Sequence, residues 1–91
     1  MKEETSVENY TISIKEPAED RLRKYDKETQ RRFATKIRKL KENPGSHGKP
    51  LRQPLHGYWE LYFEKRFRII YSIDLNNHIV NIEAIWHKDE F

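Results

Sequence analysis

The chain has 91 residues, of which 35 % are hydrophobic and 36 % charged, and a formal net charge of +3. It contains no cysteine, which excludes disulfides, thiolate metal ligands and a cysteine nucleophile and suits a reducing compartment. No apolar run reaches the roughly 18–20 residues of a membrane helix, and the polar start differs from a signal peptide. We therefore expect one cytoplasmic domain over residues 1–91, with residues 1–8 as a loose tail and no membrane partner.

Positive charge is concentrated in one segment of the sequence. Residues 15–42 hold eleven Lys and Arg against six Asp and Glu, whereas the rest of the chain is slightly acidic. A basic surface of this kind can face nucleic acid or an acidic protein. A solvated helix surface has the same composition, so the charge alone does not choose between these interpretations.

The first half of the chain predicts one strand followed by two helices. Apolar and polar side chains alternate over residues 10–15, the period of a half-buried strand. Pro17 suits the first turn of a helix, and Asp26 can cap a second helix that Asn43-Pro44-Gly45 ends. The expected buried stripes are Ala18, Leu22 and Tyr25 on the first helix and Phe33, Ile37 and Leu40 on the second.

The second half predicts three strands, with turns at Glu64-Lys65 and within residues 74–78. The side chains expected to face the helices are Trp59, Leu61, Phe63, Phe67, Ile69, Tyr71, Ile73, Val80, Ile82, Ala84 and Trp86. Both tryptophans are thus interpreted as packing residues. The element order β-α-α-β-β-β predicts an α+β domain, a mostly antiparallel four-stranded sheet with a helical hairpin packed on one face.

The opposite face of the predicted sheet is polar. The side chains expected there are Tyr62, Arg66, Arg68, Asn81, Glu83, Ile85 and His87, with Glu60 and Lys88 at the margins. Arginine can hold phosphate oxygens through two parallel hydrogen bonds, and aromatic rings can stack on bases. The face is therefore a candidate RNA surface, although an ordinary wet face with cross-strand Arg–Glu pairs has the same composition.

Four short motifs occur in order along the second half of the chain. They are Gly48-Lys49-Pro50-Leu51, Leu55-x-Gly57-x-Trp59, Arg68-Ile69-Ile70-Tyr71-x-Ile73-Asp74 and Ile85-x-His87-Lys88. Together with the element order, they resemble the RelE/ParE toxin superfamily, small proteins encoded beside an antitoxin. The resemblance spans nearly the whole chain, and it is more specific for the superfamily than for one activity within it.

RelE-like members are ribosome-dependent endoribonucleases, and the resemblance implies that activity here: cleavage of mRNA by attack of the ribose 2′-OH on the adjacent phosphate. It places Arg68 at the phosphate-binding arginine position and His87 and Lys88 at further catalytic positions. An imidazole can carry a proton at neutral pH. The resemblance implies three partners, a cognate antitoxin, the ribosome through the basic helices, and mRNA. Neither a cofactor nor a metal is expected, because the remaining histidines lack ligand-like spacing: His47, His56 and His78.

Three positions depart from the family pattern and keep other functions open. Many RNA-cutting members have basic residues where Glu60 and Tyr62 stand, and often a tyrosine near the position of Phe91. Glu60 would repel phosphate or act as a base, and Tyr62 would stack on a base or supply a hydroxyl. The candidate RNA-binding cations are Lys49, Arg52 and Arg66. The alternatives are a ParE-like inhibitor of DNA gyrase and a catalytically inactive relative that only binds an antitoxin.

Overall fold

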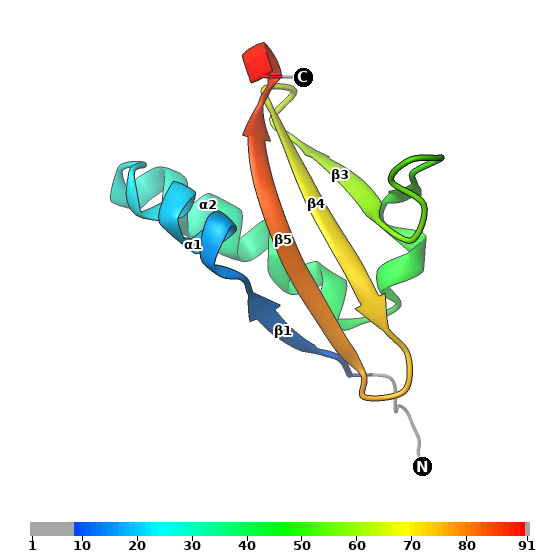
Figure 1. Cartoon of the computed structure of the whole chain (residues 1–91). Helices are drawn as coiled ribbons and strands as arrows, with labels where there is room; N and C mark the ends of the chain where they lie inside the picture. The colour runs from blue at the N-terminus through cyan, green and yellow to red at the C-terminus, as the bar shows by residue number, and fades with distance from the viewer. Residues whose placement is uncertain (1–8, 91) are drawn as a thin grey trace.

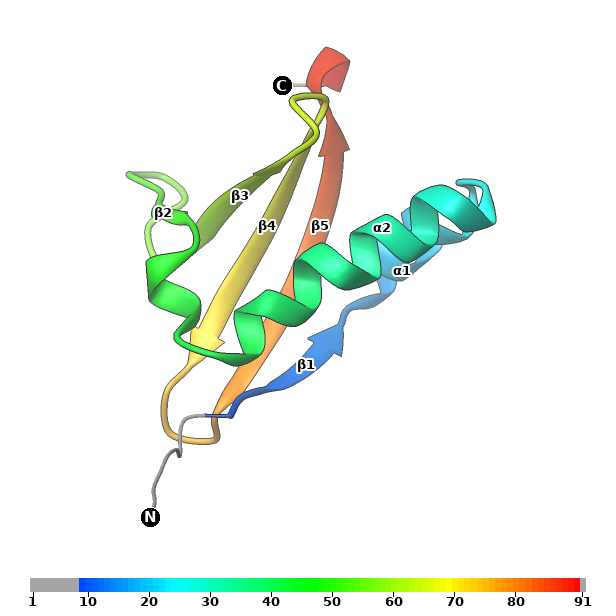
Figure 2. The same ribbon diagram turned by 180° about the vertical axis from the view of Figure 1, so that it is seen from behind.

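Two helices cover one face of a five-stranded sheet in the computed structural model, which describes residues 9–90 (Figures 1 and 2). The elements are β1 (Thr11–Ile14), α1 (Glu16–Arg23), α2 (Lys27–Arg38), β2 (Lys49–Pro50), β3 (Trp59–Phe63), β4 (Phe67–Asp74) and β5 (Ile79–His87), with 3₁₀ turns at Lys39–Lys41, Pro44–Ser46 and Lys88–Glu90. The predicted α+β class is confirmed. The expected tail, residues 1–8, lies outside the described residues.

The sheet has the strand order β1-β5-β4-β3-β2, in which β1 runs parallel to β5 and the other pairs are antiparallel. The prediction of four strands was wrong by one, because β2 forms a short edge strand opposite β3. Gly48 makes this pairing possible. A Cβ atom on Gly48 would lie 2.4 Å from the Tyr71 hydroxyl and 2.5 Å from the Glu60 carbonyl oxygen, so no other residue fits without displacing β2.

The helices begin and pack as their sequences predict. The Asp26 carboxylate accepts a hydrogen bond from the Thr29 backbone N–H at 3.2 Å, which caps α2. The predicted stripe of α2 and the turn that follows it is buried in the core. Phe33 is at its centre, with its ring centroid 4.3 Å from that of Phe63 and 5.0 Å from that of Phe67. Burial of these rings against the sheet holds the two layers together.

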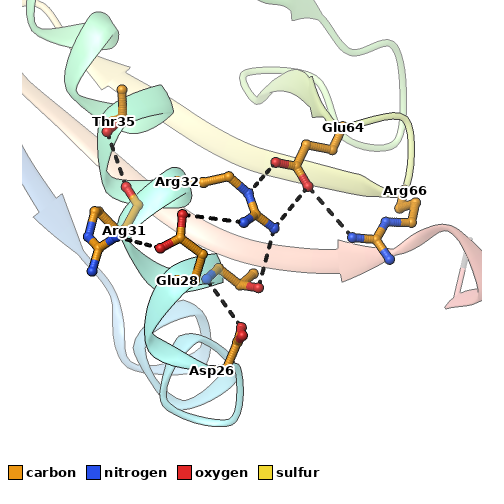
Figure 3. Close-up of polar contacts among 8 residues, drawn as sticks. Asp26, Glu28, Arg31, Arg32, Thr35, Glu64 and Arg66 are labelled. Carbon is orange, nitrogen blue, oxygen red and sulfur yellow. Dashed lines mark hydrogen bonds and ion pairs between the residues drawn. The ribbon is translucent and has the colours of Figure 1, made fainter.

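Polar contacts tie the tip of the β3–β4 hairpin to α2 (Figure 3). Glu64 and Lys65 have positive φ values of 52° and 62°, the conformation of a tight hairpin turn, although the sequence has no glycine or asparagine there. The Glu64 carboxylate lies 2.6 Å from Nε of Arg32 and 3.6 Å from Nη2 of Arg66. The hydrogen bond from Arg32 to this carboxylate raises the pKa of Arg32 above its ordinary value.

The last strand contains an irregularity that decides which side chains share a face. In the register of the two strands, Ile70 pairs with Ala84 and Tyr71 pairs with Ile82. No residue of β4 lies directly opposite Glu83, which therefore forms a β-bulge. Beyond the bulge the alternation of β5 is reversed: Ile85 is buried in the core, and Ala84 and Trp86 turn to the face without helices. The predicted core-facing positions of Ala84 and Trp86 and the polar-face positions of Ile85 and His87 were therefore wrong.

Candidate nucleic-acid interface

The face of the sheet turned away from the helices (Figure 1) is called the bare face. The strand register places two rows of residues on this face. One row crosses β3, β4 and β5 as Tyr62, Arg68 and Trp86. The row beside it crosses β2, β3, β4 and β5 as Lys49, Glu60, Ile70 and Ala84. Cross-strand neighbours lie about 5 Å apart, so these residues form one continuous surface.

Arg68 is the central cation of the bare face. Its Nε lies 2.9 Å from Oε1 of Glu60 in an ion pair, and the two side chains are 22 % and 14 % exposed. Its Nη2 donates a hydrogen bond to the Tyr62 hydroxyl at 3.2 Å, and its guanidinium carbon lies 5.7 Å from the Tyr62 ring centroid. Removal of either charge would leave the other desolvated. Carboxylate and hydroxyl thus hold the guanidinium in place on this face.

Polar residues extend the bare face along β4 and β5. Ser72 lies opposite Asn81, and its hydroxyl donates a hydrogen bond to Oε2 of Glu83 at 2.8 Å. The predicted placement of Tyr62, Arg68, Asn81 and Glu83 on one face is therefore confirmed. Whether any of them acts on RNA stays a prediction.

His87 does not belong to the bare face. It lies opposite Phe67 on the helix side of the sheet, where the two rings meet edge to face with centroids 5.4 Å apart. Its Nδ1 accepts a hydrogen bond from the Asp89 backbone N–H at 3.2 Å. The bulge is the cause, because it moves His87 to the face opposite to the one that unbroken alternation assigns.

The predicted position of Arg66 on the bare face was also wrong. Arg66 belongs to the hairpin turn, where it contacts Glu64 (Figure 3). Its guanidinium carbon lies over the Phe67 ring, 5.3 Å from the centroid. The other predicted RNA-binding cations are exposed: Lys49 on β2, opposite Glu60, and Arg52 in the loop that follows. Lys88 is exposed in the turn after β5. Phe91 lies outside the described residues.

Trp86 is the residue of this surface that sequence reasoning missed. The bulge places it, half-buried, beside Arg68. The sequence did contain one indication of an irregular strand, because unbroken alternation placed the aliphatic Ile85 on the polar face. By contrast, the packing interpretation of Trp59 is confirmed, since it packs against the core and stacks on Tyr71 with centroids 6.2 Å apart.

The basic helical segment is neutralised at one end more than at the other. The arginines of its first part are paired internally: Arg21 with Glu90, Arg23 with Glu19 and Asp20, Arg31 with Glu28, and Arg32 with Glu28 and Glu64. Within residues 9–90, the cations that follow make no ion pair: Lys36, Arg38, Lys39 and Lys41. Among the same residues 9–90, Lys15, Lys24 and Lys27 make no ion pair either. The densest group of cations without an ion pair, four within six residues, therefore lies at the C-terminal end of α2 and in the turn after it.

Among residues 9–90, no group of three His, Asp or Glu side chains is arranged to hold a metal ion. No helix of these residues is long and apolar enough to cross a bilayer.

Comparison with known proteins places the chain among toxins. Residues 12–90 match the family model of the ParE toxin of the type II toxin–antitoxin system parDE. A putative toxin, RelE4 of Methanocaldococcus jannaschii, is 30 % identical over 69 residues, which cover 76 % of this chain and 72 % of that protein.

Solved structures share the fold over most of their length. The RelBE2 toxin–antitoxin complex of Mycobacterium tuberculosis matches with a TM-score of 0.79 and 25 % identity, covering 91 % of this chain and 95 % of that chain. The archaeal RelE–RelB complex of Pyrococcus horikoshii matches with a TM-score of 0.70 and 17 % identity, covering 91 % and 99 %. The class that these relatives define is the toxin of a type II toxin–antitoxin system. This chain belongs to that class as a member of the RelE/ParE toxin family.

Proposed function

We propose that this toxin is a ribosome-dependent endoribonuclease that cleaves mRNA, and that a cognate antitoxin binds it. The observation that carries the proposal is the position of Arg68, which stands on the bare face between Tyr62 and Trp86. A guanidinium there can bind a backbone phosphate and stabilise the charge that develops during cleavage. The similar toxin structures from M. tuberculosis and P. horikoshii are complexes with their antitoxins, which supports the antitoxin partner.

The proposed reaction needs a base, a cation and an acid. The ribose 2′ oxygen attacks the adjacent phosphorus and loses its proton to the base, while the bond from phosphorus to the 5′ oxygen breaks. The acid protonates that oxygen, which leaves a 2′,3′-cyclic phosphate and a 5′ hydroxyl. Arg68 would stabilise the phosphorane, Glu60 would take the proton, and Tyr62, whose hydroxyl is 3.2 Å from Nη2 of Arg68, would donate one.

The two C-terminal candidate residues, His87 and Lys88, lie outside the group formed by Arg68, Glu60 and Tyr62. His87 would act as the acid only after leaving its contact with Phe67, so we place Tyr62 before it. Lys88, exposed after the end of β5, would contribute charge to a bound strand. The exposed Lys49 and Arg52 would contact RNA beyond the reacting phosphate.

Ribosomal RNA would be bound by the C-terminal end of α2. Its cations make no ion pair among residues 9–90: Lys36, Arg38, Lys39 and Lys41. Such cations can release counterions from a phosphate backbone when they bind it, and this contribution weakens as salt rises. Ribosome association should therefore fall with increasing ionic strength.

The test is to add the purified toxin to a translating extract and to map new mRNA ends. We expect cuts that carry a 5′ hydroxyl, and a loss of cleavage in Arg68→Ala worth about 3–4 kcal/mol of transition-state stabilisation. Arg23→Ala is the matched control, because that arginine is exposed on α1 and already paired with Asp20 at 3.0 Å. A wild-type protein that binds ribosomes but leaves the message intact would contradict the proposal.

Inhibition of DNA gyrase is the second candidate function. The ion pair of Arg68 with Glu60 favours it, because a phosphate would have to compete with a carboxylate only 2.9 Å from the guanidinium. The family model that matches the chain also carries the ParE name. A supercoiling assay with purified gyrase separates the two: inhibition with intact mRNA supports this candidate. Loss of both activities with antitoxin binding preserved would leave an inactive binding module.

A further inference from the structure

The bulge at Glu83 brings an indole ring to the bare face at the centre of the site. Trp86 pairs with Arg68 across β5 and β4, and Arg68 pairs with Tyr62 across β4 and β3. Arg68 therefore has an aromatic residue on each of the two neighbouring strands. In a sheet, adjacent strands are about 4.8 Å apart, so the three side chains occupy a length of surface comparable to a dinucleotide.

Trp86 is half-buried, so part of the residue remains exposed to solvent. The pairing of β1 with β5 ends at Ile14 and Ile82, so no strand of the described residues flanks Trp86 on the side away from Arg68. Along β5 the preceding residue on the same face is Ala84, which has a small side chain and lies opposite Ile70. A partly exposed indole on a face without helices is apolar surface suited to a flat ligand.

We propose that Trp86 forms a nucleobase-binding subsite, in which its ring stacks on the base next to the phosphate held by Arg68. This inference rests on the proposed function, since it takes single-stranded RNA as the ligand. Stacking on an aromatic ring accepts every base because each has a π-face. Trp86 therefore positions the strand and does not read its sequence, while Arg68 fixes the phosphate.

Trp86 can report its own contact through fluorescence, because the chain has only two tryptophans. Trp59→Phe leaves Trp86 as the sole indole, and Trp86→Phe leaves Trp59, which packs against the core. Each protein is titrated with a single-stranded oligoribonucleotide whose 2′ oxygens are methylated, so that it cannot be cut. We expect quenching in the Trp59→Phe protein and unchanged emission in the Trp86→Phe protein.

Affinity measurements complete the test. Trp86→Ala should weaken binding of the oligonucleotide about five- to 100-fold, the range typical of a lost stacking ring, whereas Trp86→Tyr should retain most of it. The tyrosine variant keeps the test valid if the alanine variant fails to fold. Unquenched Trp86 at the highest soluble RNA concentration would overturn the inference, as would equal quenching by duplex DNA.

The outcomes separate this inference from the proposed nuclease function. If wild type cuts mRNA in the extract while Trp86 stays unquenched and Trp86→Ala binds normally, the subsite is wrong and the nuclease stands. If RNA quenches Trp86 but the message stays intact, the subsite stands and the nuclease is lost.

Discussion

The helix-covered face of the sheet and the bare face differ in what fixes their side chains. On the covered face, ring contacts around Phe33 join α2 to β3 and β4, with no exposed surface on Phe33 itself. On the bare face, Arg68 contacts the Glu60 carboxylate and the Tyr62 hydroxyl and keeps part of its surface in solvent. Stability should therefore depend mainly on the first face and ligand binding on the second.

The largest effect that would sharpen this comparison is expected from Phe33→Ala. The ring is completely buried and contacts Tyr25, Phe63 and Phe67. Its loss should cost about 3–5 kcal/mol, much of the roughly 5–10 kcal/mol that a domain of this size has. Denaturant unfolding measures the change. Tyr62→Ala on the bare face is the control, since Tyr62 is 49 % exposed and should change stability far less.

A similar loss of stability in both variants would break the comparison. It would mean that the contact of Tyr62 with Arg68 carries part of the folding free energy. The bare face would then be a structural surface and not one kept for a ligand.

Gly48→Ala tests whether the edge strand β2 depends on the close approach of residue 48 to β3 and Tyr71. The new methyl would lie 2.4 Å from the Tyr71 hydroxyl on the covered face and 2.5 Å from the Glu60 carbonyl oxygen. Overpacking of this kind should cost about 1–3 kcal/mol and should move Lys49 from its place opposite Glu60. Unfolding free energy and RNA affinity should therefore fall together in this variant.

Gly45→Ala provides the matched control for that prediction. A Cβ atom there would lie 3.5 Å from the nearest atom of the Trp59 ring, an ordinary contact. We expect its stability and RNA affinity to stay close to those of wild type. If Gly48→Ala behaves in the same way, β2 does not need the close approach to Tyr71.

The strands show why the fold could be predicted further than the site. Within β3 and within β4 the alternation is unbroken, so the covered and bare faces of these two strands followed from the sequence, although the turn residue Arg66 did not. In β5, the added residue Glu83 is visible only in its pairing with β4, and it reversed the positions of Trp86 and His87. Alternation assigns a face and not a partner, so the contact of Arg68 with Glu60 needed the hairpin register.

The smallest expected change in stability concerns the C-terminal turn that follows β5. The Glu90 carboxylate contacts Arg21 on α1 at 2.7 Å and 2.5 Å and accepts a hydrogen bond from the His87 backbone N–H. The Arg21 hydrogen bonds, followed by that of His87, lower the pKa of Glu90 from 4.5 to about 2. A carboxyl with a lowered folded pKa stabilises the fold above its unfolded pKa, and this contribution is lost as pH falls.

The unfolding temperature should therefore fall slightly more in wild type than in Glu90→Gln as pH falls from 4.5 to about 2. Arg21→Gln, which removes the partner of the Glu90 carboxylate, is the companion variant and should flatten the slope in the same direction. Parallel curves for wild type and Glu90→Gln would mean that Arg21 does not hold the turn in solution. The end of β5 would then be anchored by its pairing with β4, by the hydrogen bond from the Lys88 N–H to the Arg66 carbonyl and by the packing of His87 on Phe67.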